Sequence, residues 1–101
     1  MIPAMPNERL NIPEEEYRKI LGNVFESLDP LRLKVLSSKE KKKLAALQRI
    51  AEEFTPGRQY AEKEINAILK AIYSDFATLR RDLIDYGYLC RTDNCSAYWR
   101  A

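Results

Sequence analysis

TLRRDLIDYGYLCR, residues 78–91, is the stretch of sequence that decides the fold. Leu79 and Leu83 are about one helical turn apart and define an apolar face, and two adjacent arginines fall outside that face. Gly87 then ends the helix, and apolar residues resume directly after it. The stretch therefore predicts a short amphipathic helix that passes into a strand, with basic side chains available on its outer surface.

The residues that follow, YLCRTDNCSAYWRA at 88–101, predict a two-stranded hairpin. Aromatic and apolar residues flank the turn signal TDNC, as in strands that are joined by a short loop. Upstream, Ser74 is expected to cap the helix, which runs through Tyr86. The side chains expected to point inward from this helix are those of Phe76, Leu79, Leu83 and Ile84.

Three earlier helices are predicted from apolar residues at helical spacing. They are preceded by residues 1–12, which lack periodicity and are expected to be extended or mobile. Alternating apolar residues predict a strand at about 31–35, and a short extended segment is expected at 58–60. The helices are expected from Pro13 to about Phe25, from a cap at Ser37 or Ser38 to about Glu53, and from Glu62 to about Ile72.

The order helix, strand, helix, helix, hairpin is that of a winged helix-turn-helix, in which the second helix of the pair enters the DNA major groove. The expected fold class is therefore α+β, mainly α, with an extra N-terminal helix and a C-terminal two-stranded wing. Residues 1–30 are assigned to an arm and helix for packing or dimerisation, and residues 31–101 to the winged-helix domain. The apolar stripe expected to pack on the body or to build a homodimer is Tyr17, Ile20, Leu21 and Val24.

Length and composition exclude several classes of protein. A chain of 101 residues with 46% apolar and 32% charged residues fits one globular domain. No segment approaches the roughly 18 apolar residues of a membrane span, and the N-terminus lacks a basic start and a long apolar stretch, so a cytoplasmic protein without a membrane partner is expected. The sequence has no histidine that could serve as a base for a serine or cysteine nucleophile, and it has no glycine-rich phosphate loop. Neither an enzyme nor a cofactor is therefore expected.

The net charge is only +2, but it is unevenly distributed. Residues 1–38 carry five basic and six acidic side chains, whereas residues 39–101 carry twelve basic and nine acidic ones. Four lysines, at 39 and 41–43, cluster at the start of the second helix, where the helix dipole disfavours positive charge. A solvated charged face and an anionic partner are the two explanations for this cluster.

The helix in the recognition position has a mixed outer face. Its outermost residues are expected to be Thr78, Arg81, Asp82 and Asp85. Arg80 lies at the flank, where it could pair with an acidic residue of the domain. Arginines contact phosphates or guanine edges, whereas aspartates repel phosphate. The residues expected to contact DNA are Thr78, Arg80, Arg81, Lys41, Lys42, Lys43, Arg91 and Arg100.

The motif TLRRDL at residues 78–83 closely resembles the recognition helix of DeoR-type winged-helix repressors. More of the chain resembles a bacterial family known as domain-of-unknown-function family 2087, through KKKLAALQRIAEEF, PGRQYAEKEINAILK, DFATLRRDLIDYGYL and the terminal YWR, between about Leu36 and Arg100. The resemblance implies a winged helix with a regulator-like role. The positions that match its motifs are Thr78, Arg80, Arg81 and Asp82 in the helix and Tyr98 and Trp99 in the hairpin.

Two positions depart from that family pattern. Ala61 stands where similar sequences have a hydroxyl residue capping the third helix, a loss of about 1 kcal/mol. Cys95 stands where they have a glycine in the hairpin turn, so Asn94 is expected to take the left-handed conformation. Cys90 and Cys95 are expected to be free thiols. A disulfide is the alternative under oxidising conditions, and a metal site is the other alternative, which the absence of histidine disfavours.

The leading hypothesis is a dimeric regulator that binds duplex DNA in a sequence-specific way. In a second hypothesis the mixed face of arginines and aspartates binds another protein. In a third, aromatic residues near the hairpin stack on RNA or on single-stranded bases, although such residues more often fasten a hairpin to its helices. These aromatic residues are Tyr86, Tyr88, Tyr98 and Trp99.

Overall fold

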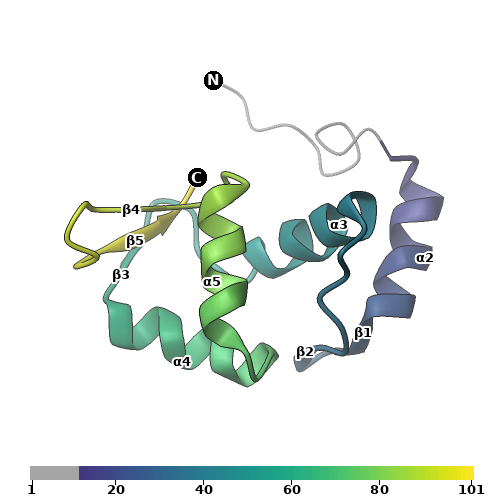
Figure 1. Ribbon diagram of the computed structural model, residues 1–101, viewed down its shortest axis with the longest axis horizontal. Helices are drawn as coiled ribbons and strands as arrows, with labels where there is room; N and C mark the ends of the chain where they lie inside the picture. The colour runs from purple at the N-terminus through teal and green to yellow at the C-terminus, as the bar shows by residue number, and fades with distance from the viewer. Residues whose placement is uncertain (1–11) are drawn as a thin grey trace.

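A computed structural model describes residues 12–101, so the expectation for residues 1–11 lies outside the described part of the chain. The described residues form two small antiparallel sheets; the sheet that contains the C-terminal strands lies at one end of the longest axis, and the helix of residues 14–24 lies at the other (Figure 1). In chain order the elements are α2 (Glu14–Val24), β1 (Phe25–Leu28), β2 (Leu31–Leu33), α3 (Glu40–Ala51), β3 (Gln59–Tyr60), α4 (Glu62–Ile72), α5 (Phe76–Asp85), β4 (Leu89–Arg91) and β5 (Tyr98–Arg100).

Helix α3 is the most deeply buried element. Its side chains from Ala45 to Leu47, together with Ile50 and Ala51, are at most 3% exposed. Helix α2 contacts α3, α5 contacts it from another side, and α4 in turn packs against α5. A helix that is apolar over most of its circumference is stable only when neighbouring elements cover it. The other helices are therefore arranged around α3.

The wing belongs to a three-stranded antiparallel sheet with the strand order β3-β5-β4. Tyr98 in the central strand pairs with Tyr60 of β3 and with Arg91 of β4. Tyr60, Tyr98 and Leu89 are at most 2% exposed and fasten the sheet to the core. The predicted hairpin and the predicted fold class, α+β and mainly α, are confirmed, and the order of elements is consistent with a winged helix-turn-helix.

The N-terminal helix α2 packs on the body of the domain. The four side chains of its apolar stripe are at most 9% exposed within a single chain, and the helix contacts α3. Glutamates occupy its first turn, where the helix dipole favours negative charge. The packing role predicted for the stripe is confirmed. A homodimer through the same side chains stays a prediction, and it would have to replace their contacts within the chain.

The segment after α2 forms a hairpin of which only the second strand was predicted. Strand β1 pairs with β2 across a turn that contains a cis peptide bond between Asp29 and Pro30. Leu31 and Leu33 are buried, but Val35 lies beyond the end of the strand and is 46% exposed. No turn residue separates β1 from α2, so periodicity alone could not place the strand. The hairpin spans the boundary expected between residues 30 and 31.

The predicted caps of two helices are wrong. Neither predicted serine caps α3, which begins after Lys39; the Ser37 hydroxyl instead accepts a hydrogen bond from the Lys39 backbone N–H at 3.1 Å. Helix α5 begins after Asp75, whose carboxylate accepts from the Thr78 backbone N–H at 3.3 Å. Ser74 lies one residue too early to reach that donor. A carboxylate in this position also interacts favourably with the helix dipole.

Helix α4 begins after Ala61 without a side-chain cap, as its sequence predicts. The Ala61 backbone N–H donates to Glu64 Oε1 at 3.0 Å, which is half of a capping box. The other oxygen of Glu64 accepts from Arg58 at 2.7 Å, and the Arg58 guanidinium lies 4.4 Å from the centroid of the Tyr60 ring. These contacts offset part of the missing hydroxyl cap.

The wing turn places its left-handed residue at Cys95, with φ 60°, and not at Asn94 as predicted. Asn94 has another role: its side-chain oxygen accepts from the Ser96 backbone N–H at 3.1 Å and from the Thr92 hydroxyl at 2.9 Å. Thr92 Oγ1 also accepts from the Ala97 backbone N–H at 3.2 Å. This network fixes the turn and leaves Cys95 in a conformation that suits glycine.

We predict that Cys95→Gly gives a more stable protein than Cys95→Ala, by about 1 kcal/mol. Both variants lose the thiol, but only glycine avoids the clash of a Cβ atom in the left-handed region. Chemical denaturation of the two variants measures the difference. Equal stabilities, or a more stable alanine variant, would contradict the assignment of this turn.

The Tyr17 hydroxyl is buried without a hydrogen-bond partner among residues 12–101. Burial, followed by the nearby charge of Glu52, raises the Tyr17 pKa above its usual value of 10.0. The neutral phenol is therefore favoured in the folded state, and folding loses stability as the pH rises above the value of the unfolded chain.

We predict that Tyr17→Phe matches or exceeds the wild type in stability, by up to about 1 kcal/mol at neutral pH, because it removes an unsatisfied polar atom. Above pH 10 the wild type should lose stability more steeply than the variant does. Thermal midpoints at pH 7 and pH 10.5 measure both effects. A variant that is less stable than wild type at both pH values would show that the hydroxyl has a stabilising partner.

Candidate nucleic-acid interface

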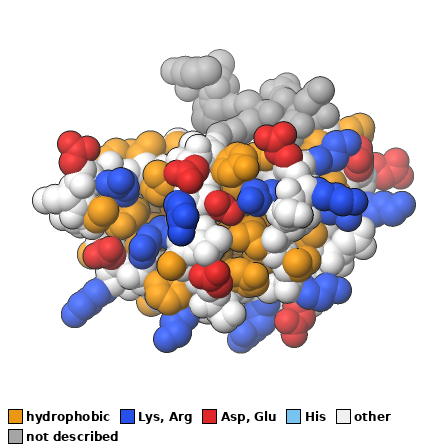
Figure 2. Space-filling view, viewed as in Figure 1, with side chains coloured by type: hydrophobic (Ala, Val, Ile, Leu, Met, Phe, Trp, Pro, Cys, Tyr) orange, Lys and Arg blue, Asp and Glu red, His pale blue; other side chains and the backbone are white. Residues whose placement is uncertain are grey.

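A groove of about 280 Å³ lies between α5 and the wing. Its basic side chains come from Arg80 and Arg81 of α5 and from Arg91 of β4. The acidic side chains of Glu62 and Asp85 also line it. Figure 2 shows this mixture on the face that carries α5, where basic and acidic side chains are interspersed with apolar ones.

Arg81 is the basic side chain of α5 that is available to a partner. It is exposed, and it makes no hydrogen bond or ion pair with the residues that the structure describes. Leu79 and Leu83 are fully buried, so the helix turns Arg81 outward as its periodicity predicts. An unpaired guanidinium can bind a phosphate or the edge of a guanine without first breaking an internal contact.

Arg80 instead connects α5 to α4. Its guanidinium donates a short hydrogen bond to the side-chain oxygen of Asn66 on α4. The predicted acidic partner is therefore wrong, since the acceptor is a neutral amide. Arg80 keeps its full positive charge beside the groove, while its position is fixed by α4. No local pattern marks Asn66, a single polar residue on a helix flank, so sequence analysis did not identify it.

The outer face of α5 differs from its prediction at two positions. Thr78 is half-buried, and its hydroxyl donates to the capping carboxylate of Asp75 at 2.8 Å. Asp82 is also half-buried rather than outermost, because Lys43 of α3 lies 3.4 Å from its carboxylate. The same ammonium group is 5.7 Å from the centroid of the Tyr86 ring. One of the two carboxylates expected to repel phosphate is thus neutralised within the domain.

Two of the four lysines at the start of α3 have internal anionic partners, as the residues 41–43 that were expected to contact DNA show. Lys41 donates to Glu16 of α2 at 3.0 Å, and Lys43 pairs with Asp82 of α5. Lys42 is half-buried and has no polar partner among the described residues. None of the three lines the groove beside the wing. Two of the three lysines therefore hold α2 and α5 against α3, although each retains part of its exposed surface.

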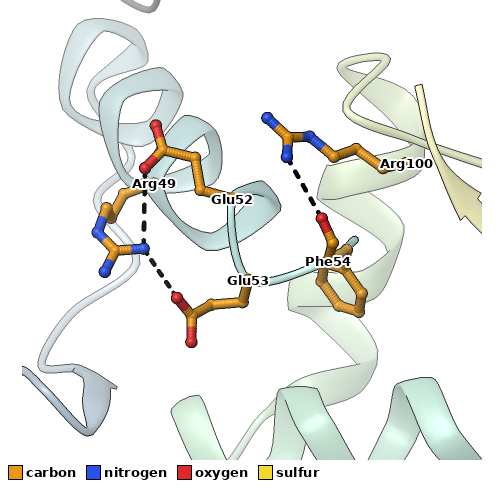
Figure 3. Close-up of polar contacts among 5 residues, drawn as sticks. All are labelled: Arg49, Glu52, Glu53, Phe54 and Arg100. Atoms are coloured by element: carbon orange, nitrogen blue, oxygen red, sulfur yellow. Dashed lines mark hydrogen bonds and ion pairs between the residues drawn. The ribbon is translucent and has the colours of Figure 1, made fainter. Parts of the chain in front are cut away.

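The two arginines of the wing have different environments. Arg91 is exposed at the groove and donates to the backbone oxygens of Thr92 and Asp93, at 3.0 and 3.3 Å. Arg100 points away from that groove and donates at 3.3 Å to the carbonyl of Phe54, just after α3 (Figure 3). Of the two arginines, the structure brings only Arg91 together with Arg81.

A separate cluster of charges occupies the C-terminal end of α3. Arg49 lies 3.9 Å from the carboxylate of Glu52 and 3.0 Å from that of Glu53, as Figure 3 shows. With Arg100 beside it, this end of the helix carries two guanidinium groups where the dipole favours positive charge. Arg49 offsets the two carboxylates, which the dipole disfavours at this end, and none of these side chains lines the groove beside α5.

Two of the four aromatic residues expected to stack on bases are core residues. Tyr88 and Tyr98 are 3% and 1% exposed, whereas Tyr86 and Trp99 are half-buried. Burial, followed by a hydrogen bond with the Cys95 thiol, raises the pKa of Tyr98. The buried rings leave little aromatic surface on the wing for base stacking. Tyr98, a position that matches the family motif, lines the groove, and so do Glu62 and Ala77, which were not predicted because their approach depends on tertiary packing.

Cys90 and Cys95 are free thiols, as the sequence analysis predicts. Within residues 12–101 no group of three or more potential ligands is placed to hold a metal ion. None of the described helices is long and apolar enough to cross a membrane.

A protein-family model described as "Uncharacterized protein conserved in bacteria (DUF2087)" matches residues 32–100. The match extends from β2 to the last strand and leaves α2 and β1 outside it. Searches of curated proteins and of solved structures found no significant match to the chain. The family resemblance read from the sequence is confirmed, while the likeness of α5 to DeoR-type recognition helices stays a prediction.

We predict that Arg80→Ala and Asn66→Ala each destabilise the fold by about 1–2 kcal/mol, because each removes one partner of a charge-assisted hydrogen bond. The double variant should be less destabilised than the sum of the two, by about 1 kcal/mol. Asn66→Asp keeps an acceptor oxygen and should preserve stability. Arg81→Ala is the matched control and should change stability by less than about 0.5 kcal/mol. Additive losses at Arg80 and Asn66 would show that the two side chains act independently.

Proposed function

We propose that this chain, which belongs to the bacterial DUF2087 family, is a transcription regulator that binds duplex DNA through α5. One observation carries the proposal: three guanidinium groups, those of Arg80, Arg81 and Arg91, line a single groove between α5 and the wing. A winged helix-turn-helix uses its second helix and its wing on neighbouring parts of a duplex. The likeness of TLRRDL to DeoR-type recognition helices points to the same surface.

Each arginine has a role that follows from its surroundings. Arg81, exposed and unpaired within residues 12–101, reads a base edge in the major groove. Arg91 contacts a backbone phosphate next to it, and Arg80 adds positive charge from a position that Asn66 fixes. The pairing of Asp82 with Lys43 reduces repulsion between α5 and phosphate. Lys42, at the start of α3, has no ion-pair partner among the described residues and is available to attract the duplex.

A dimer is part of the proposal, because a twofold-symmetric regulator matches the symmetric operators that such proteins read. The apolar stripe of α2 is buried against the body, so a dimer that preserves the fold needs another contact surface. DNA binding also implies a cytoplasmic protein in a bacterium.

A protein-interaction module is the second candidate. Asp85 and Glu62 share the groove with the three arginines, and a surface with both charges suits a protein partner of complementary charge. The third hypothesis, binding of RNA or single strands, relies on aromatic residues of which two are core residues. Competition between duplex and single strands distinguishes it from the first.

We predict that Arg81→Ala lowers specific affinity for a duplex selected from a random library by about 1–3 kcal/mol without changing the thermal midpoint. Lys42→Ala should weaken binding to all sequences alike and reduce the slope of log affinity against log salt by about one. Arg100→Ala is the matched control, because this side chain binds the Phe54 carbonyl, and it should leave specificity unchanged. Fluorescence anisotropy at two salt concentrations measures all three variants.

If Arg81→Ala binds the selected duplex as tightly as the wild type does, base reading by α5 is excluded. If the wild type selects no duplex at all, the protein-interaction module becomes the first candidate.

A further inference from the structure

A second groove, of about 580 Å³, lies between the β1–β2 hairpin and the C-terminal ends of α3 and α4. In the lower half of Figure 2, where Figure 1 places α4 and this hairpin, apolar side chains are exposed. Leu28 at the end of β1 is 46% exposed and is one of two large hydrophobic side chains exposed to that degree within residues 12–101. The apolar residues that line the groove are Leu28, Pro30, Leu31, Ile68, Ala71 and Ile72.

The charges around this groove include one unpaired group of each sign on the same hairpin. Asp29 at the turn and Arg32 on β2 line the groove, are exposed, and have no ion-pair partner among the described residues. The other two charged side chains of the lining, Arg49 and Glu53, neutralise each other at 3.0 Å. The available charges are therefore one carboxylate and one guanidinium, three residues apart.

We infer that this groove binds a second copy of the same chain in a twofold-symmetric dimer. In such an interface one patch contacts the identical patch, so the patch must complement itself. Here a protruding apolar side chain, Leu28, stands beside an apolar groove, and an unpaired carboxylate stands beside an unpaired guanidinium. Each hairpin turn inserts into the groove of the other copy, and Asp29 of each copy pairs with Arg32 of the other.

The position of the groove is compatible with the surface proposed for DNA. Helix α5 lies between the wing and the β1–β2 hairpin in Figure 1, and the two grooves share no lining residue. Dimerisation through the hairpin therefore leaves Arg81 and Arg91 uncovered. The inference rests on the hairpin groove alone, and it holds whether or not the chain binds DNA.

The first test measures the mass of the full chain by analytical ultracentrifugation over a range of concentrations. We expect the wild type to reach twice the mass of one 11.8 kDa chain, and Leu28→Asp to raise the dimer dissociation constant by about tenfold or more. Val35→Asp is the matched control, because Val35 has the same exposed fraction, 46%, but does not line the groove. Circular dichroism establishes that both variants are folded.

The second test exploits the symmetry of the contact. Asp29→Arg leaves two guanidinium groups on each hairpin and Arg32→Asp leaves two carboxylates, so each variant alone should be a monomer. Mixing the two should restore a dimer, because every charge then meets its opposite. The double variant Asp29→Arg/Arg32→Asp should dimerise like the wild type.

A wild type that stays monomeric at every concentration overturns the inference. A dimer that persists in Leu28→Asp overturns it as well, because the contact would then lie elsewhere. Failure of the mixed charge variants to associate would exclude the twofold pairing of Asp29 with Arg32. None of these results depends on affinity for DNA: a monomeric wild type would remove the dimer from the proposed function and leave the test of DNA binding unaffected.

Discussion

The burial of α3 is the constraint on which the rest of the structure depends. Its side chains at Ala45, Leu47 and Ile50 are fully buried, so the helix needs cover from more than one direction. Lysines in its first turn add to this cover: Lys41 pairs with Glu16 of α2, and Lys43 with Asp82 of α5. The dipole disfavours positive charge in this turn, and the ion pairs offset that cost. The two pairs fix helices that are distant in sequence on the same central element.

This arrangement determines which charges remain for a partner. Four charged side chains that the sequence alone assigns to the surface make contacts within the domain: Lys41, Lys43, Asp82 and Arg100. Arg81 and Arg91 remain exposed at one groove, and Asp85 is the exposed carboxylate of α5 beside them. With Asp82 paired to Lys43, the groove beside α5 holds three arginines, Arg80, Arg81 and Arg91, against two carboxylates, Asp85 and Glu62. The excess of arginines supports DNA as the partner, while the exposed carboxylate of Asp85 supports a protein partner as the alternative.

Periodicity predicted the elements whose packing follows a single face. Helix α4 has the expected bounds, α2 and α5 lie within a few residues of theirs, and the wing forms over residues 89–100. The strand β1 was not predicted, because no local signal separates FESL from the helix before it. The cap at Asp75 and the left-handed residue Cys95 depend on competition among neighbouring polar groups. The partners of Arg80 and Lys43 lie in other helices, and side-chain pairing over that distance leaves no pattern in one sequence.

The central claim is that α5 and the wing form a surface that binds duplex DNA. Amide chemical shifts of the isotope-labelled full chain, titrated with a selected duplex, test it most directly. The account predicts that the largest changes fall on residues 77–85 and 89–93, with small changes in α2 and the β1–β2 hairpin. No saturable change in α5, or changes concentrated outside α5 and the wing, would contradict it.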